Sequence, residues 1–495
     1  MVKDRMMAAD ETKYSLPEES AVHAFGGHAS KRSMLLIAIL IVVGGALRWI
    51  ACYSDFWLDE IWSYFRCNEL SSSLGVFTEF RSSNNHHLYS LMMLALGDRH
   101  HWVGYRIPSM IVGTLTVLLV YAAARHEDRL AVGLPAVMTA TSYLMIHFSS
   151  EARGYALVVF FAVASYICVR RYGERGEWGS ALLFSLCTFF GFLSHMQYVF
   201  IWLALLAWQF VCVVKPSPDR KRMIVQFLKC FSFPVVIFVC FYFLVVAQME
   251  IGGGPPYRLT DILVKTLSYA GGGPASGAWA VVVAIAMSIL LFASLIHMLK
   301  SPSSEWVFFL VVIVIAPAIV LLASRPDVLF VRYFLISIAF AYIAIGSLLA
   351  HLARRNAGGK IAVLSILVLF LAGNALNIKR LFQHGRGGYR EALWHMERET
   401  TGPVITVSSD HHFRNRMVID YYTRFLTAGK TLTYLDGRNT EPPAAEWILL
   451  HRIGEAGDFR DTIHDQAGRT YRAEKQFPYS DMSGWHWFLY RVTKP

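Results

Sequence analysis

Charged residues are scarce in this chain. They make up only 16% of its 495 residues, whereas 55% are hydrophobic; an average soluble domain has about 25% charged residues. The deficit lies in the first three quarters of the chain, in apolar runs of roughly 17–25 residues, the length that crosses a bilayer. This pattern excludes a soluble protein and predicts a polytopic α-helical membrane protein.

Several functional signals are also missing. The chain has no G-x-G-x-x-G or Walker pattern and no tandem repeat, and its seven cysteines lack metal spacing. Cys52 and Cys67 could pair, although proximity in sequence does not show geometry. A net charge of +11 would suggest nucleic acid in a soluble protein. Here basic loops facing anionic lipid explain it, and we expect no nucleic-acid partner.

Eleven apolar runs are long enough to be spans. Lys and Arg are more frequent in the loops on the N-terminal side of the membrane than in the longer loops on the other side. The positive-inside rule therefore places the N-terminus in the cytoplasm and the C-terminus outside. The predicted spans are 34–53, 106–124, 131–148, 154–170, 180–195, 198–214, 223–247, 278–298, 305–323, 333–352 and 361–378.

These spans divide the chain into three parts. We expect a cytoplasmic N-terminal tail at 1–33 and a transmembrane domain at 34–380, whose large first outer loop is 54–105. An apolar segment at 87–97 is too short to span and is predicted to be an interfacial helix. From 381 to 495 the composition is that of a soluble domain, and alternating helix and strand patterns predict a small extracytoplasmic α/β domain. Its predicted helices are 389–399 and 413–425, and its predicted strands are 403–408, 431–434, 446–451 and 485–492.

The middles of the spans contain almost no charge. Arg48 and Arg106 lie near span ends, where long side chains can snorkel to water. A transporter or flippase for lipid-linked sugars would need ionisable or broken-helix features near the midplane, and the sequence shows none. The polar residues instead gather in the outer loops, which favours a reaction at the outer surface. A non-catalytic scaffold presenting the C-terminal domain is a further alternative.

Two adjacent carboxylates, Asp59 and Glu60, follow the first span and lie between Trp57 and Trp62. Shielding by the two rings would raise the basicity of a carboxylate by desolvation, as a general base for a hydroxyl or amine requires. The alternative is a helix start, because acidic residues are favoured in a first helical turn.

A pair of histidines, His86 and His87, opens the interfacial segment. Histidines beside a carboxylate can bind a divalent metal, with Glu60 and His86 as the candidate ligands. Neighbouring positions on one helix point apart, so only one of the two histidines would face a given site. Polar capping of that helix is the alternative.

The remaining candidates lie in three other outer loops. Glu151 and Arg153 occupy a tight turn, where they could pair with each other or Arg153 could bind a phosphate. Arg332, followed by Tyr333, enters the tenth span as an anchor or an anion contact. Arg258 belongs to a Gly- and Pro-rich loop, which is either a loop over a site or a linker. Acids, histidines and arginines on one side of the membrane suit a lipid-phosphate substrate.

Taken in order, these motifs resemble the GT-C class of polyprenyl-phosphate-sugar-dependent glycosyltransferases. The similarity is to the branch that holds protein O-mannosyltransferases and the lipid A aminoarabinose transferase, and it covers Met34 to about Ile378. The resembling stretches are W-L-D-E (57–60), N-H-H-L-Y (85–89), G-Y-R-I-P-S (104–109), S-x-E-A-R-G-Y (149–155) and R-Y-F (332–334).

The resemblance implies a fold of about 11 transmembrane helices and a site at its outer surface. Asp59 would be the catalytic base, accompanied by Glu60. Glu151 and Arg153 would contribute from a second outer loop, and Arg332 would meet the lipid phosphate. It also implies inverting transfer of a hexose or pentose from a polyprenyl-phosphate donor to a glycan, lipid or protein acceptor. The place would be the bacterial inner membrane, among membrane lipids, and a divalent metal ion is left open as a cofactor.

Overall fold

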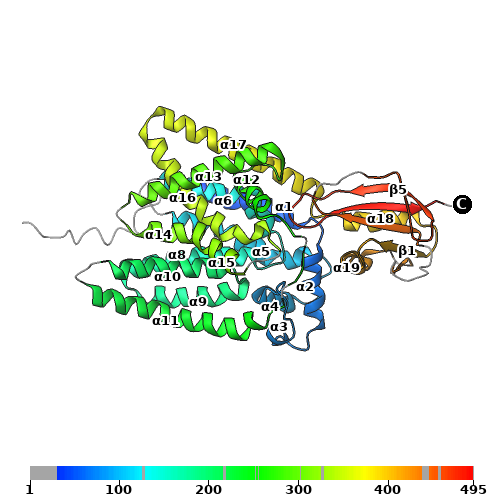
Figure 1. Ribbon diagram of the computed structural model, residues 1–495, viewed down its shortest axis with the longest axis horizontal. Coiled ribbons are helices and arrows are strands. Elements are labelled where there is room, and N and C mark those ends of the chain that lie inside the picture. Colours follow the sequence, from blue (N-terminus) through cyan, green and yellow to red (C-terminus); the bar gives the residue numbers. More distant parts are fainter. Residues whose placement is uncertain are drawn as a thin grey trace, which may run out of the picture.

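The computed structural model (Figure 1) describes residues 31–124, 129–215, 219–250, 252–254, 256–301, 303–324, 328–427, 429–436, 445–454 and 459–493. The predicted N-terminal tail lies outside the described residues except for 31–33, which open the first helix.

Each predicted span coincides with a helix or with consecutive helical segments. Seven helices in the described part of the chain are long and apolar enough to cross a membrane, and the count of eleven spans stays a prediction. The helices at the spans are α1 (Lys31–Cys52), α5 (Val103–Ala123), α6 (Arg129–Thr141), α7 (Tyr143–Ser149), α8 (Tyr155–Arg175), α9 (Trp178–Ser194), α10 (Tyr198–Val214), α11 (Arg220–Leu244), α13 (Gly277–Leu299), α14 (Glu305–Leu310), α15 (Ala316–Ser324), α16 (Leu335–Arg355) and α17 (Ala357–His384).

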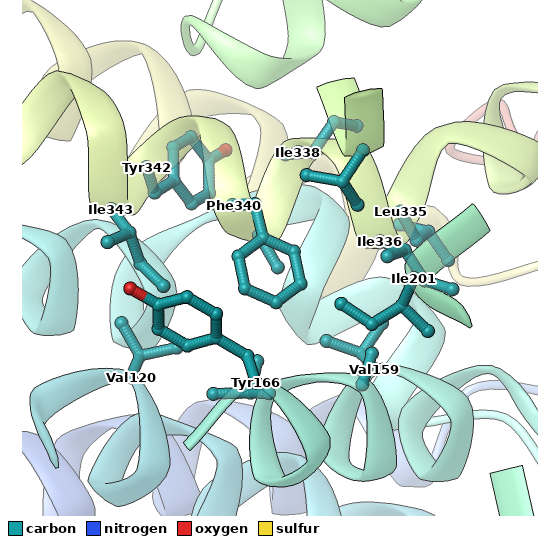
Figure 2. Close-up of a cluster of buried hydrophobic side chains, with 14 of the residues drawn as sticks. Val120, Val159, Tyr166, Ile201, Leu335, Ile336, Ile338, Phe340, Tyr342 and Ile343 are labelled. Atoms are coloured by element: carbon teal, nitrogen blue, oxygen red, sulfur yellow. The ribbon is translucent and has the colours of Figure 1, made fainter. Parts of the chain in front are cut away.

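Helix α16 lies at the centre of the bundle. Its sequence is apolar on every side, as expected of a fully surrounded helix, and 89% of the most apolar window in Val331–Arg355 is buried. Figure 2 shows Phe340 of α16 against Tyr166 of α8, with ring centroids 5.6 Å apart. The 3-10 turn η4 (Val331–Phe334) leads into α16. Arg332 therefore enters the bundle at its most enclosed helix.

The first outer loop folds into three short helices, α2 (Leu58–Glu69), α3 (Gly75–Thr78) and α4 (His87–Leu96). Helix α4 matches the predicted short helix at 87–97. Helix α2 begins after Trp57, whose backbone N–H donates to Glu60 Oε2 at 3.4 Å. Asp59 and Glu60 thus do lie in a first helical turn, as the helix-start alternative required. On the same side of the bundle, α12 (Leu259–Ala270) precedes α13, with a 3-10 turn η2 (Val246–Gln248) after α11.

The C-terminal domain is the predicted small α/β unit. Its six strands form one sheet in the order β2-β1-β3-β6-β5-β4; β1 is parallel to β2 and β3, and the other pairs are antiparallel. Strands β4 and β5 were not predicted, because β4 is short and β5 is rich in polar residues. The elements are α18 (Tyr389–Glu399), β1 (Val404–Ser409), α19 (His412–Tyr422), η5 (Thr423–Phe425), β2 (Thr431–Tyr434), β3 (Trp447–Arg452), β4 (Thr462–His464), β5 (Thr470–Phe477) and β6 (His486–Val492).

The C-terminal domain and the first outer loop share a hydrophobic core. The sheet lies at one end of the molecule, and α2 and α19 meet at the junction with the bundle (Figure 1). Phe56 packs against Tyr421 with ring centroids 5.4 Å apart. The Tyr422 hydroxyl accepts from Phe56 N at 2.6 Å and donates to Phe56 O at 3.0 Å. These contacts fix the domain over the loop that carries Asp59. Nearby, Cys52 and Cys67 are separate free thiols.

Candidate active site

The Asp59 carboxylate is the point where three distant segments meet. Its Oδ2 atom lies 2.7 Å from Arg153 Nη1 and 3.6 Å from Arg332 Nη2. The Asp59 side chain is 17% exposed, and its Oδ1 atom makes no hydrogen bond to any residue that the structure describes. We call Asp59, Arg153 and Arg332 the open cluster. It contains an anion, two cations and one carboxylate oxygen left for a ligand.

Arg153 is held in place on several sides. Its Nη2 donates to Asn84 Oδ1 at 2.6 Å, and its guanidinium lies 4.9 Å from the ring centroid of Tyr155 and 5.8 Å from that of Trp57. Asn84 Nδ2 in turn donates to the Asp59 carbonyl oxygen at 2.9 Å and to Ser63 Oγ at 3.1 Å. Asn84 therefore fixes the distance between α2 and the turn that holds Arg153.

In the described segment that leads into α16, Arg332 is the residue that contacts Asp59. The Arg332 guanidinium lies 3.8 Å from the ring centroid of Phe330. Tyr333 packs against the same ring, at 5.9 Å between centroids. Arg258 caps α12 and is exposed; in the described part of the chain its side chain makes no hydrogen bond or ion pair. The structure therefore does not bring Arg258 or Tyr333 into contact with the carboxylate.

Glu60 lies next to Asp59 but in a different environment. It is fully buried and both of its oxygens are occupied. Oε1 accepts from Arg106 Nε at 2.8 Å and from Ala152 N at 2.6 Å, and Oε2 accepts from Arg106 Nη2 at 2.5 Å. Arg106 also donates to the carbonyl oxygens of Cys52 and Asp55. Glu60 thus joins α2, α5 and the turn after α7, and no oxygen of it faces a ligand.

Glu151 belongs to a second buried group, which we call the closed cluster: Glu151, His147, Arg386 and Ser483. Glu151 Oε1 lies 3.3 Å from Arg386 Nε and 3.2 Å from His147 Nε2, and it accepts from Ser483 Oγ at 2.5 Å. Burial opposes ionisation, but the hydrogen bond from His147 and the charge of Arg386 hold the pKa of Glu151 below its ordinary value. The closed cluster ties the C-terminal domain to the membrane bundle.

The two predicted histidines point to different places. His86 lies 4.9 Å from His195 and 5.0 Å from Tyr155 between ring centroids, and its Nδ1 is 3.2 Å from the Ser194 carbonyl oxygen. Its buried Nε2 has no hydrogen-bond partner among the described residues. Burial, reinforced by the charge of Arg153, lowers the pKa of His86 well below 6.5. His87 instead stacks on Phe77 at 5.4 Å.

A close backbone approach explains the glycine in the motif at 149–155. A Cβ atom on Gly154 would lie 2.0 Å from the Ser194 carbonyl oxygen and 2.9 Å from His86 Nδ1. Only glycine leaves room for these two neighbours. Gly154 therefore lets the Arg153 turn and the His86 pocket come together.

The donor set does not fit a divalent metal as it is arranged here. Both oxygens of Glu60 are bound by Arg106, Asp59 already faces two cations, and no group of three His, Cys, Asp or Glu residues in the described ranges could hold a metal ion. Metal-ligating carboxylates need free lone pairs. We therefore derive no step through a metal.

Sequence reasoning missed Arg106, Arg386, His195 and Ser483. Arg106 and Arg386 are fully buried, whereas a snorkelling side chain would reach water. The available signal for Arg106 was its position at the first residue of an apolar run, because a cation that is buried there needs an anionic partner. The segments around Arg386 and Ser483 carry no comparable pattern.

Comparison with known proteins supports the fold. No family model and no curated protein matches the sequence. The apo oligosaccharyltransferase of Archaeoglobus fulgidus matches in structure with a TM-score of 0.52 and 11% identity, covering 82% of this chain and 64% of that one. The arabinosyltransferase EmbB of Mycobacterium smegmatis gives a TM-score of 0.43 and 13% identity, covering 78% of this chain and 39% of that one.

The first of these similarities is sufficient to indicate a shared fold. The chain spans about 64% of the length of the archaeal enzyme. The fold class expected from the resemblance is therefore confirmed: this multi-pass membrane protein has the fold of the GT-C glycosyltransferases, with a small C-terminal α/β domain.

Proposed function

We propose that the protein is a membrane glycosyltransferase that moves a sugar from a polyprenyl-phosphate donor to a hydroxyl or amine acceptor outside the membrane. The observation that carries the proposal is the open cluster, in which Asp59 Oδ2 meets Arg153 and Arg332 while Oδ1 makes no hydrogen bond to a described residue. The GT-C fold supports it, because the archaeal enzyme of the same fold transfers oligosaccharides. The N-terminus would be cytoplasmic, and the C-terminal domain would lie outside the bacterial inner membrane.

In the proposed reaction, Asp59 acts as the general base, and Arg153 and Arg332 bind the phosphate of the donor. The acceptor hydroxyl gives its proton to Asp59 Oδ1 as its oxygen forms a bond to the anomeric carbon. The bond from that carbon to the phosphate oxygen breaks, and its electron pair leaves on the polyprenyl phosphate. Arg153 and Arg332 stabilise the negative charge that grows on the phosphate. Attack from the face opposite to the leaving group inverts the anomeric centre.

Other residues of the site act through these three. Glu60 and Arg106 are positioning residues, because they fix α2 against α5 and the Arg153 turn. The neutral His86 ring, whose Nε2 has no hydrogen-bond partner among the described residues, is a candidate contact for the sugar. Contacts of His87, Arg258, Tyr333 and Glu151 with substrate stay predictions from the sequence.

A flippase is the main rival. Arg48 is buried within the bundle, but it donates to the carbonyl oxygens of Gly44 at 2.9 Å and Thr139 at 3.2 Å, so it holds α1 against α6. The buried carboxylate–arginine pairs described above all lie at the predicted outer end of the bundle. This distribution favours chemistry at the outer surface over transport through the middle.

The test is a transfer assay with purified protein in detergent, labelled polyprenyl-phosphate sugars and crude acceptor. We expect Asp59→Asn to reduce transfer about 10²–10⁴-fold, the usual contribution of a general base. Glu69→Gln is the matched control, because Glu69 is an exposed acid on the same helix, and it should transfer like the wild type. Full activity of Asp59→Asn would refute the base assignment, and a wild type inactive with every donor would favour the flippase or scaffold.

A further inference from the structure

A basic cavity lies at the end of the bundle opposite to Asp59. It has a volume of about 470 Å³ and opens between the end of α8, the start of α9 and the first turns of α11. Helix α8 begins beside Arg153 and runs for 21 residues, which corresponds to about 30 Å. The cavity is therefore a bilayer thickness away from the open cluster. Its polar lining includes Lys221, Arg222, Gln226 and Lys229.

The charge of the cavity is not balanced by any ion pair among the described residues. Lys221, Arg222 and Lys229 make no ion pair with any carboxylate that the structure describes. Among the neighbouring acids, Glu174 lies 4.0 Å from Arg170 and Glu177 lies 3.4 Å from Arg175. Asp219 precedes α11 at its N-cap position and forms no ion pair with the three cations. Three cations around one cavity, with no counter-ion among the residues that the structure describes, favour an anionic ligand.

Apolar side chains lead from the cavity along the outside of the bundle. On α9, Trp178, Leu182 and Leu186 recur every four residues and are 65%, 52% and 45% exposed. This spacing puts them on one face of the helix. On α11, Val225 and Leu228 are also exposed, at 47% and 56%. Helices α9 and α11 pack side by side (Figure 1), so the two apolar stripes run next to each other.

We propose that this cavity binds the headgroup of an anionic phospholipid, whose acyl chains lie along the exposed faces of α9 and α11. Basic pockets at the ends of membrane helices suit lipid phosphates, and a tryptophan such as Trp178 is favoured at headgroup level. A soluble anion would use the cations alone, whereas a phospholipid uses the cations and both apolar stripes. The site is separate from the proposed transferase site and does not depend on that activity.

The test measures lipid binding by the purified full-length protein in detergent. We expect phosphatidylglycerol to bind more tightly than phosphatidylcholine. The triple variant Lys221→Gln, Arg222→Gln, Lys229→Gln should bind phosphatidylglycerol about 100-fold more weakly, since each cation near a lipid surface contributes about fivefold. The matched control is Lys300→Gln, Arg355→Gln, Lys360→Gln, which removes three exposed cations outside the cavity and should bind like the wild type.

The same experiment can overturn the proposal. Equal weakening in both triple variants would indicate a general charge effect, and unchanged binding in the cavity variant would exclude the site. Equal affinity for phosphatidylcholine would contradict the requirement for negative charge. Inorganic phosphate that displaces the lipid at equal concentration would show a simple anion site instead. All substituted residues are exposed, and equal Tm values for the three proteins would show that the variants are folded.

Discussion

The open and closed clusters are built from the same short turn but differ in how exposed their carboxylates are. Glu151 and Arg153 are two residues apart, yet Glu151 faces Arg386 and Ser483 of the C-terminal domain and Arg153 faces Asp59. The side chains of Glu151 and Arg386 are fully buried, whereas Asp59 is 17% exposed. Glu151 Oε2 also lacks a hydrogen-bond partner among the described residues, but it is buried. The difference therefore shows that a charged residue in an outer loop acquires its role from its access to a ligand, not from its type.

The adjacent residues Asp59 and Glu60 show the same contrast within the first turn of α2. Glu60 gives both oxygens to Arg106 and Ala152, whereas Asp59 Oδ1 has no hydrogen-bond partner in the described ranges. A buried ion pair costs several kcal/mol when one partner is removed, because the other charge stays buried without a counter-ion. A partly open pair costs much less. Glu60 and Asp59 should therefore separate stability from activity.

The largest effect that we expect is on stability, in Glu60→Gln. The substitution leaves the buried Arg106 guanidinium without an anion, and it should lower the free energy of unfolding by about 3–5 kcal/mol. Thermal unfolding in detergent measures this as a lower Tm. Asp59→Asn is the comparison, because the same kind of change one residue away should lower Tm less and reduce transfer about 10²–10⁴-fold. Equal Tm losses in the two variants would refute the contrast between Glu60 and Asp59.

The sequence was informative where local chemistry decides the structure. Apolar runs of bilayer length located the membrane helices, and the helix and strand patterns at 389–399 and 431–434 match α18 and β2. Asp59, Arg153 and Arg332 were each singled out in separate loops, and the structure brings them together. Their meeting depends on helix packing, which the sequence expresses only through the family resemblance.

Contacts between residues that are far apart in the sequence could not be predicted. The partners of Arg106 and Arg386 are 46 and 235 residues away in the sequence, so no local pattern joins them. The expected shielding of Asp59 by two tryptophans is not what the structure shows, because Trp62 packs against Phe413 of α19 at 6.0 Å between centroids. Trp62 was expected to lie at the membrane interface, but it packs against the C-terminal domain.

A smaller effect, with a characteristic pH dependence, is expected from Glu151→Gln. Loss of the charge partner of the buried Arg386 should cost about 3 kcal/mol at pH 7, the lower end of the range for a broken buried pair, because Glu151 meets Arg386 in a single contact at 3.3 Å whereas Glu60 binds Arg106 through two. Because the pKa of Glu151 is held below its ordinary value of 4.5 in the folded protein, its ionised form stabilises the fold fully above about pH 4.5, and this contribution is lost as the pH falls further. The Tm difference between wild type and variant should be full at pH 7 and shrink below pH 4.5. A difference that is the same at pH 7 and pH 4 would contradict the pairing.

The smallest effect that we expect is at an exposed ion pair between the C-terminal domain and the first outer loop. It tests whether such a pair contributes as much stability as the buried closed cluster. Arg424 Nη2 of the C-terminal domain lies 3.1 Å from Asp98 Oδ1 of the loop, but the two side chains are 30% and 64% exposed. Water and salt screen such a pair, so Arg424→Gln should change stability by about 1 kcal/mol or less and leave transfer unchanged. Thermal unfolding at low and high salt measures both variants, with Glu151→Gln as the buried counterpart, which salt should affect less. If Arg424→Gln lowered the stability as much as Glu151→Gln, burial would not explain the difference between the two ion pairs. The position of both pairs at the domain junction would then have to explain their contributions to stability.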